Sequence, residues 1–155
     1  MKCLILAAGY ATRMYPLTEN FPKPLLDVGG KTILDWLVDD ISNNCGIKDF
    51  VIISNHKFYD RFLSWAEAKT KASLISITVL DDGSTDNNHR LGAVKDIEFA
   101  IDQMNINEDI LVLAGDNVLD FSFSNFVSYA RNVNTTCIMR HLQPSLEKHR
   151  KTGVT

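Results

Sequence analysis

The chain has 155 residues, of which 45% are hydrophobic, and it carries a formal net charge of -3. This size and composition suit one compact domain over residues 1–155, and the negative charge argues against nucleic acid as a main partner. The apolar run at the N-terminus is too short to cross a membrane and has no clear signal-peptide features. We therefore expect a cytoplasmic protein with no membrane partner.

Short apolar runs rich in strand-forming residues alternate along the chain with segments of helical period. This alternation is typical of α/β proteins, in which crossover helices join parallel strands. The predicted strands are residues 3–7, 50–53, 74–80, 110–114 and 135–139. Most of them are continuously apolar, which predicts helices on both faces of the sheet.

Four stripes of apolar residues with helical spacing predict the helices. Thr32 and Asp35 resemble a capping box at the start of the first one. The stripes cover residues 33–41, 58–66, 93–104 and 123–130. Their aromatic and methionine residues are interpreted as core.

Ligands of an open parallel sheet bind beyond the carboxyl ends of the strands. The residues that follow the predicted strands are therefore candidates for the functional site. They are Gly9 and a long loop with Arg13 and Lys23 after the first strand, Asp81 to Gly83 after the third, and Gly115 to Asn117 after the fourth. If the strands are parallel, groups suited to phosphates and metals converge on one edge.

The segment from Leu6 to Thr18 reads LAAGYATRMYPLT and is the most informative stretch of the chain. Its small residues allow a ligand to approach the backbone, and Arg13 offers a planar fork to phosphate oxygens. The glycine and lysine spacings of dinucleotide-binding and Walker A loops are absent, which disfavours a classical NAD-binding domain. The structural alternative is a tight turn at Gly9 with Arg13 in solvent.

Lys23 and Asp116 are the two other charged candidates. Lys23 stands between two prolines that stiffen its segment, which suits an anion, although an ordinary exposed lysine has the same pattern. Asp116 ends a buried strand and can hold Mg²⁺ beside phosphates, with Gly115 leaving room for the ligand. The alternative is a turn in which Asp116 and Asn117 bond the local backbone.

Taken together, three motifs resemble the signature of the sugar-phosphate nucleotidyltransferases. They are residues 6–17, Pro22-Lys23-Pro24-Leu25-Leu26 and Gly115-Asp116-Asn117. The resemblance, to enzymes such as glucose-1-phosphate thymidylyltransferase and mannose-1-phosphate guanylyltransferase, implies a Rossmann-like three-layer sandwich around a mostly parallel sheet. It also implies a nucleoside triphosphate and a sugar 1-phosphate as substrates and Mg²⁺ as cofactor, and it leaves a homo-oligomer open.

Carried over by position, the resemblance implies catalytic roles for Arg13, Lys23 and Asp116, with Asp116 also the metal ligand. It implies nucleotide contacts at the residues that match the family's binding loops, which are Leu6, Ala7, Ala8, Gly9, Thr12, Asp82 and Gly92. The reaction would be in-line attack of a sugar-phosphate oxygen on the α-phosphorus, with pyrophosphate leaving.

This chain differs from the family pattern at three places. Residues 82–90 form a longer and more polar link than the family's usual one, which contains glutamine and proline. Ala11 stands where the family often has a second glycine, and residues 137–140 lack the family's glycine near the sugar. Gly153-Val154 looks like the pair that precedes the family's sugar-binding glutamate, so we expect an N-terminal portion that lacks the sugar and second-metal region. The alternatives are a choline-phosphate cytidylyltransferase-like enzyme and a regulatory relative that does not turn over.

Overall fold

The structure, a computed structural model, describes residues 1–140, so the Gly153-Val154 pair lies outside the described residues. The chain divides into two units, Met1–Ser124 and Asn125–Thr155. The sheet and every candidate site residue belong to the first unit. None of the helices in the described part is long and apolar enough to cross a membrane.

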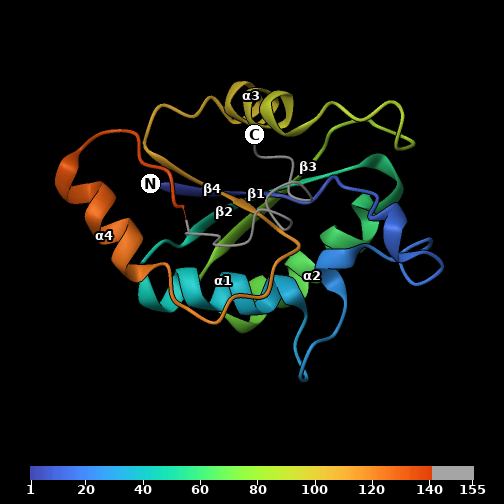
Figure 1. Cartoon of the computed structure of the whole chain (residues 1–155), viewed down its shortest axis with the longest axis horizontal. Coiled ribbons are helices and arrows are strands. Elements are labelled where there is room, and N and C mark those ends of the chain that lie inside the picture. The colour runs from blue at the N-terminus through green and yellow to red at the C-terminus, as the bar shows by residue number, and fades with distance from the viewer. Residues whose placement is uncertain (141–155) are drawn as a thin grey trace, which may run out of the picture. The chain divides into compact units, whose positions relative to one another are not determined.

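The first unit is built on a sheet of four parallel strands in the order β3-β2-β1-β4 (Figure 1). The strands are β1 (Lys2–Leu6), β2 (Asp49–Ser54), β3 (Ser76–Asp81) and β4 (Ile110–Ala114). Four of the five predicted strands are therefore present, β4 with the predicted bounds. The α/β prediction is confirmed.

Helices cover both faces of this sheet, as the continuously apolar strands predict. Figure 1 shows α3 (Ala93–Met104) on one face and α1 (Ile33–Asn44) and α2 (Tyr59–Ala72) on the other. On the α3 side, Leu4 and Val51 join Ala100 in one buried cluster. The alternate strand residues Ile5 and Ile52 are also fully buried and face the opposite side. The three-layer prediction is thus confirmed.

The chain changes direction across the sheet between β1 and β4. Helices α1 and α2 carry it from β1 to β2 and on to β3, and α3 then carries it back to β4 on the other side of β1. Connections diverge at such a reversal, and ligands of open α/β sheets bind there, beyond the carboxyl ends of the two strands. The loops after β1 and β4 meet at this point.

The predicted strand at residues 135–139 is wrong. After α4 (Ser124–Val133), the described residues run without regular structure, and Ile138 is 85% exposed. A strand is stable only when its backbone groups pair with a neighbouring strand, and no such pairing includes this segment in the described residues. Its apolar character alone does not supply that partner.

The capping box predicted at the start of α1 is present. The Thr32 hydroxyl accepts a hydrogen bond from the Asp35 backbone N–H at 2.9 Å, and an Asp35 carboxylate oxygen accepts one from the Thr32 backbone N–H at 3.1 Å. Two of the helix's otherwise unpaired N–H groups are satisfied in this way. The cap fixes where the chain leaves the long loop and enters α1.

Replacing Thr32 with alanine should lower the free energy of unfolding by about 1 kcal/mol, because the cap's acceptor is lost. Urea denaturation measures the change. Thr32→Ser keeps the hydroxyl and is the matched control, for which we expect a much smaller loss. Equal losses for the two variants would mean that the methyl group, and not the cap, stabilises this turn.

Candidate functional site

The ends of β1 and β4 approach each other closely at Gly115. The Gly115 N–H donates to the Leu6 carbonyl at 2.9 Å, which extends the pairing of the two strands by one residue. A Cβ atom at position 115 would lie 3.0 Å from a methyl group of Ile5 and 3.2 Å from the Leu6 carbonyl oxygen. The glycine therefore allows the two backbones to approach closely without crowding. That it also leaves room for a ligand stays a prediction.

Lys23 and Asp116 meet beside this contact. The Lys23 Nζ lies 3.0 Å from Asp116 Oδ2, although the residues are 93 positions apart in the sequence. Lys23 begins the short 3-10 helix η2 (Lys23–Leu25), and Asp116 follows β4 by two residues. The Asn117 side-chain amide donates to the other carboxylate oxygen at 3.2 Å. Two of the three charged residues predicted for the site thus form one exposed ion pair.

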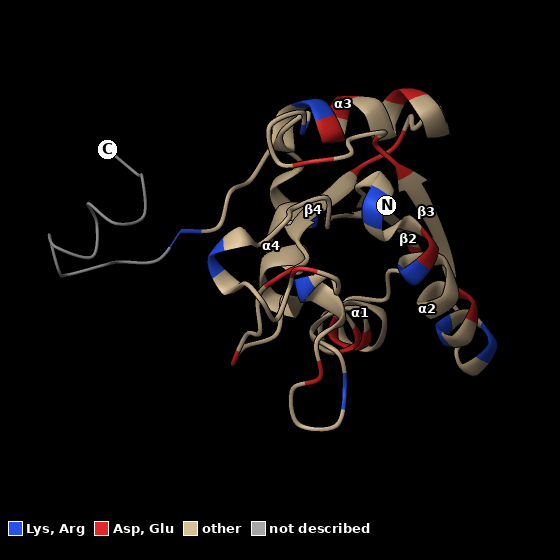
Figure 2. Ribbon diagram, turned by 90° about the vertical axis from the view of Figure 1, so that its right-hand side faces the viewer, with Lys and Arg blue, Asp and Glu red and all other residues tan. Residues whose placement is uncertain are grey.

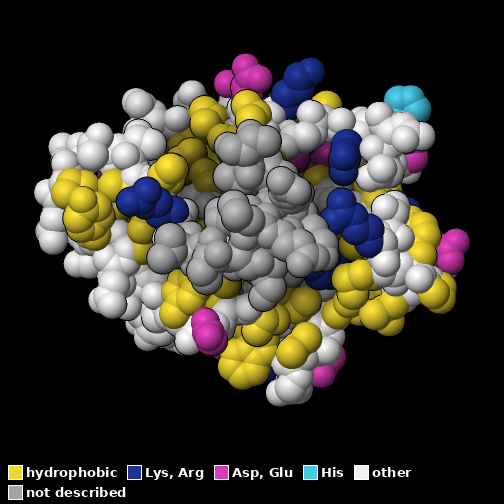
Figure 3. All heavy atoms as spheres, in the orientation of Figure 1, with side chains coloured by type: hydrophobic (Ala, Val, Ile, Leu, Met, Phe, Trp, Pro, Cys, Tyr) yellow, Lys and Arg dark blue, Asp and Glu magenta, His cyan; other side chains and the backbone are white. Residues whose placement is uncertain are grey.

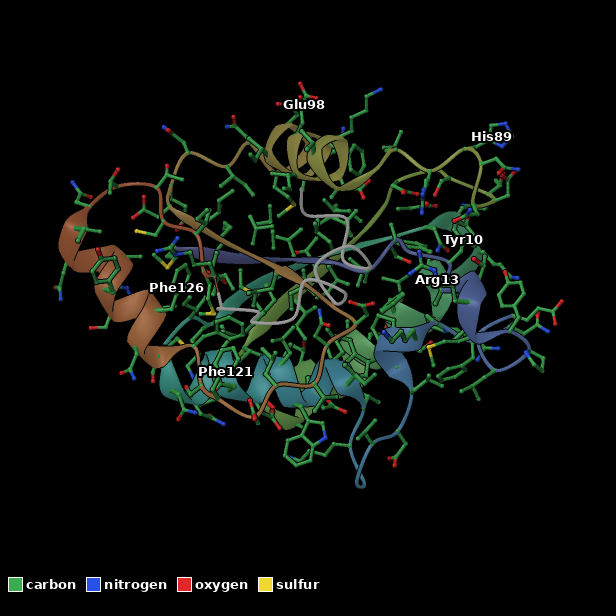
Figure 4. All side chains as sticks on the ribbon, viewed as in Figure 1. Tyr10, Arg13, His89, Glu98, Phe121 and Phe126 are labelled. Carbon is green, nitrogen blue, oxygen red and sulfur yellow. The ribbon has the colours of Figure 1, made fainter. Side chains whose placement is uncertain are left out.

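Gly9 and Arg13 lie in the long loop after β1. Gly9 is exposed, and Arg13 belongs to the 3-10 helix η1 (Thr12–Met14) together with Thr12 (Figure 4). Within the described part of the chain, the Arg13 side chain has neither a hydrogen bond nor an ion pair. The structure therefore brings Gly9, Lys23 and Asp116 to the reversal point between β1 and β4, and it leaves Arg13 in solvent in the same loop.

Ala11 adopts the left-handed backbone conformation, with φ at 47° and ψ at 39°. This conformation costs a residue with a Cβ atom roughly 1–2 kcal/mol. Two hydrogen bonds hold it, because the Ala11 carbonyl accepts from the Met14 N–H at 2.9 Å and from the buried Thr18 hydroxyl at 2.8 Å. The fold thus uses here the conformation that a glycine would adopt without strain.

Asn55 is a buried polar residue of this edge that the sequence analysis did not select. It follows β2, is 0% exposed, and donates from Nδ2 to the Ala8 carbonyl at 3.0 Å. Its Oδ1 accepts from the Phe58 N–H at the same distance, at the start of the 3-10 helix η3 (His56–Phe58). Its position directly after a predicted strand is the sequence signal that could have identified it as a site residue. The candidates named from the sequence follow the other strands.

The loop after β3 is tied to its neighbours by its backbone. The Asp82 N–H donates to the Ser54 carbonyl at 2.9 Å, and the Ser84 carbonyl accepts from the Tyr10 hydroxyl at 2.8 Å. The Asp82 carboxylate accepts from the N–H and the hydroxyl of Ser84, both at 2.7 Å. Figure 2 shows the ribbon in red at the tip of β3, where Asp81 and Asp82 follow each other. Asp82 therefore orders its own loop in this structure.

Asp96 in the first turn of α3 faces the same loop. It is 5% exposed, and one of its oxygens, like one of Asp82, is buried without a hydrogen-bond partner in the described part of the chain. Burial, followed by repulsion from Asp82, raises the pKa of Asp96 to about 6. Gly92, which precedes α3 with φ at 90°, accepts from the Asp96 N–H at 3.0 Å. Asp82 in the β3–α3 connection and Asp96 in the first turn of α3 thus form a pair of carboxylates that repel each other.

A separate groove of about 690 Å³ lies between α1 and the segment 117–123. Trp36 and Phe121 line it, together with Asp40, whose carboxylate accepts from the Phe123 N–H at 2.9 Å. Figure 3 shows hydrophobic side chains exposed along the lower part of this face. The groove includes Asn117 but none of Gly9, Arg13, Lys23 and Asp116. Its size suits a ligand, and it adjoins the edge between β1 and β4 through Asn117, whose side-chain amide donates to Asp116.

The sequence pattern of the nucleotidyl transferase family matches residues 2–154. The chain belongs to this family. The resemblance stated from the three motifs is therefore confirmed. GlmU, a bifunctional protein of Methanococcus vannielii, is 28% identical over 133 residues, which are 86% of this chain and 28% of that protein. N-acetylmuramate alpha-1-phosphate uridylyltransferase of Neisseria meningitidis serogroup B is 46% identical over 61 residues, 39% of this chain and 25% of that protein.

Solved structures show the nucleotidyltransferase fold. A Bacillus anthracis protein described as a glucose-1-phosphate thymidylyltransferase, in complex with a sucrose, has a TM-score of 0.73 at 24% identity and covers 85% of this chain. HddC from Yersinia pseudotuberculosis, complexed with GMP-PN, has a TM-score of 0.65 at 21% identity and covers 83%. The chain spans 50% and 53% of these two proteins. It therefore corresponds to part of the nucleotidyltransferase fold.

The raised pKa of Asp96 makes the stability of this chain depend on pH. The native state binds more protons than the unfolded chain between about pH 4 and pH 6, so the contribution of Asp96 to stability is lost as pH rises through this range. Asp96→Asn removes the charge and should raise the free energy of unfolding by roughly 1–3 kcal/mol at pH 7.5, with little change at pH 4.

Denaturation curves at the two pH values measure this difference. Asp102→Asn, at an exposed position of the same helix, is the control and should change stability little at either pH. A gain for Asp96→Asn that is the same at pH 4 and pH 7.5 would show that the pKa of the carboxyl is not raised in the native state.

Proposed function

We propose that this chain forms the nucleotide-binding part of a sugar-phosphate nucleotidyltransferase. The reaction is nucleotidyl transfer from a nucleoside triphosphate to a sugar 1-phosphate, with release of pyrophosphate. Family membership supports the reaction class, and the Lys23–Asp116 pair at the reversal point supports the place of the site. The names of the relatives agree with these substrates, since they include a uridylyltransferase acting on a sugar 1-phosphate.

The Lys23–Asp116 pair is the main observation behind the proposal, because it places a positively charged group beside a carboxylate that can bind a metal ion. In the absence of nucleotide, each charge neutralises the other at 3.0 Å. We propose that the triphosphate separates them, so that Lys23 turns to the phosphate oxygens and Asp116 to a cation. An exposed pair of this kind contributes only about 0–1 kcal/mol to stability, so separating it costs little.

Asp116 fits a Mg²⁺ ion that is shared with the substrate. The described residues contain no cluster of three side chains suited to a metal. Mg²⁺ in nucleotide sites is commonly held by one or two carboxylates and by phosphate oxygens, which matches a single exposed Asp116. When bound, the ion would neutralise phosphate charge.

The other residues of the loops have binding roles in this proposal. The backbone from Leu6 to Gly9 faces the base and ribose, and Thr12 and Gly92 line the nucleotide. Arg13 binds the triphosphate tail, since its guanidinium has no partner in the described part of the chain and can turn toward anions. Catalysis then comes from alignment and charge neutralisation, without a protein nucleophile.

A thermal-shift screen tests the proposal directly. Only a ligand that prefers the folded chain raises its melting temperature. We expect one of ATP, GTP, CTP, UTP and dTTP, each with Mg²⁺, to raise it by several degrees. No shift with any of the five nucleotides would contradict the proposal.

Replacing Asp116 with asparagine keeps the shape and removes the charge. In the 155-residue chain, this change should abolish the Mg²⁺-dependent part of nucleotide binding and leave the Mg²⁺-independent part, because only the metal loses a ligand. Calorimetry with and without Mg²⁺ measures both parts. A strong loss of thermal stability in the absence of ligand, with the Mg²⁺ dependence unchanged, would show that Asp116 is a structural turn residue.

Arg13→Ala should weaken triphosphate binding more than monophosphate binding. The guanidinium would pair with the β and γ phosphates, and such charge-assisted bonds contribute about 1.5–3 kcal/mol, which is more than a tenfold change in affinity. Calorimetric titrations with GTP and GMP, and with UTP and UMP, provide the comparison. Equal losses within each pair of ligands would place Arg13 away from the triphosphate tail.

A further inference from the structure

We propose that Asn55 is a positioning residue that orients the Ala8–Gly9 peptide so that the Gly9 N–H faces the nucleotide. The inference rests on the proposed function, because it assigns a role at the same edge of the sheet. It adds a residue from the end of β2, which lies outside all three motifs of the resemblance.

The Asn55 side chain forms hydrogen bonds with two backbone groups from different parts of the chain. Its side chain is fully buried, with Nδ2 donating to the Ala8 carbonyl and Oδ1 accepting from the Phe58 N–H, both at 3.0 Å. The first contact joins residues 47 positions apart, whereas the second is a local cap of η3. The cap of η3 uses only the acceptor, Oδ1. The donor, Nδ2, is therefore left to bind the loop after β1.

The bond to Ala8 also fixes the direction of the next N–H group. The only cis peptide bond in the described residues is Tyr15–Pro16, so the Ala8–Gly9 peptide is trans. In a trans peptide the carbonyl and the N–H point in opposite directions. Because the Ala8 carbonyl points inward to buried Asn55, the Gly9 N–H points outward.

The outer side of Gly9 is open. Gly9 is exposed, a Cβ atom placed on it would have no other heavy atom within 4 Å, and its N–H has no hydrogen-bond partner among residues 1–140. An oriented backbone donor without a partner, at the reversal point of the sheet, suits an acceptor oxygen or nitrogen of the nucleotide. Asn55 keeps this donor in place before the ligand arrives, which lowers the cost of ordering on binding.

Asn55→Asp separates the two functions of the side chain. It keeps an acceptor for the Phe58 N–H and loses the donor to Ala8 when the new carboxyl is ionised. When the carboxyl is protonated, its O–H can donate to Ala8 again, and burial raises the pKa at which this occurs. An ionised carboxylate at this buried position also destabilises the fold. A melting temperature of Asn55→Asp well above the titration temperature at pH 8.5 therefore shows that the loss of affinity is not a loss of folded chain.

Calorimetric titrations of the 155-residue chain with MgGTP and with MgUTP, at pH 5.5 and pH 8.5, provide the test. At pH 8.5 we expect Asn55→Asp to bind the nucleotide at least tenfold more weakly than the unchanged chain, and at pH 5.5 we expect most of this difference to disappear. Because both proteins bind the same nucleotide at each pH, the effect of the nucleotide's own protonation on affinity cancels in their ratio. Ser42→Ala, which removes a buried hydroxyl bonded only to its own helix, is the control and should leave the affinity unchanged at both pH values.

An NMR measurement without ligand tests the orientation of the Gly9 N–H separately from the proposed function, which fails only if none of the five nucleotides binds. In the free chain, the Gly9 amide should exchange rapidly with solvent, while the Asn55 side-chain amide should be protected. A protected Gly9 amide, or an affinity ratio for Asn55→Asp that is the same at both pH values, would overturn the proposal.

Discussion

The close approach of the β4 end to the β1 end is the constraint on which the candidate site depends. At Gly115 the backbones are so near that a Cβ atom would lie 3.0 Å from a side chain of β1. This contact continues the parallel pairing past Ala114, and it puts Asp116 beside the loop that carries Lys23. Because the strand order reverses at the same pair of strands, the place of closest approach is also the place where ligands of open α/β sheets bind.

Buried backbone contacts, more than contacts among charged side chains, hold this edge in shape. Asn55 binds the Ala8 carbonyl, Asp82 donates from its backbone to Ser54, and Tyr10 donates to the Ser84 carbonyl. These bonds link the loops after β1, β2 and β3 before any ligand is present. The charged groups Arg13, Lys23 and Asp116 lie at the exposed ends of this framework, where they can change partners at low cost.

Periodicity and caps predicted most of the fold, because these signals are local. The strand at 110–114, the helix at 93–104 and the Thr32 cap follow from spacing and side-chain chemistry alone. The prediction of a strand at 135–139 failed because pairing needs a neighbour that composition does not specify.

The meeting of Lys23 with Asp116 could be anticipated from the ends of the strands. The role of Asn55 could not, since an asparagine after a strand is equally typical of a turn. The left-handed conformation of Ala11 could not be predicted from the sequence either, because the groups that donate to its carbonyl belong to residues further along the loop.

The central claim is that a nucleoside triphosphate binds at the reversal point between β1 and β4. Hydrogen–deuterium exchange of the whole chain, read by mass spectrometry with and without MgGTP or MgUTP, tests it most directly. We expect the nucleotide that binds to slow exchange in peptides covering residues 7–18 and 115–117, with little effect on peptides at the far end of α1. Protection confined to the groove beside Trp36 and Phe121, with the loop after β1 unchanged, would contradict it.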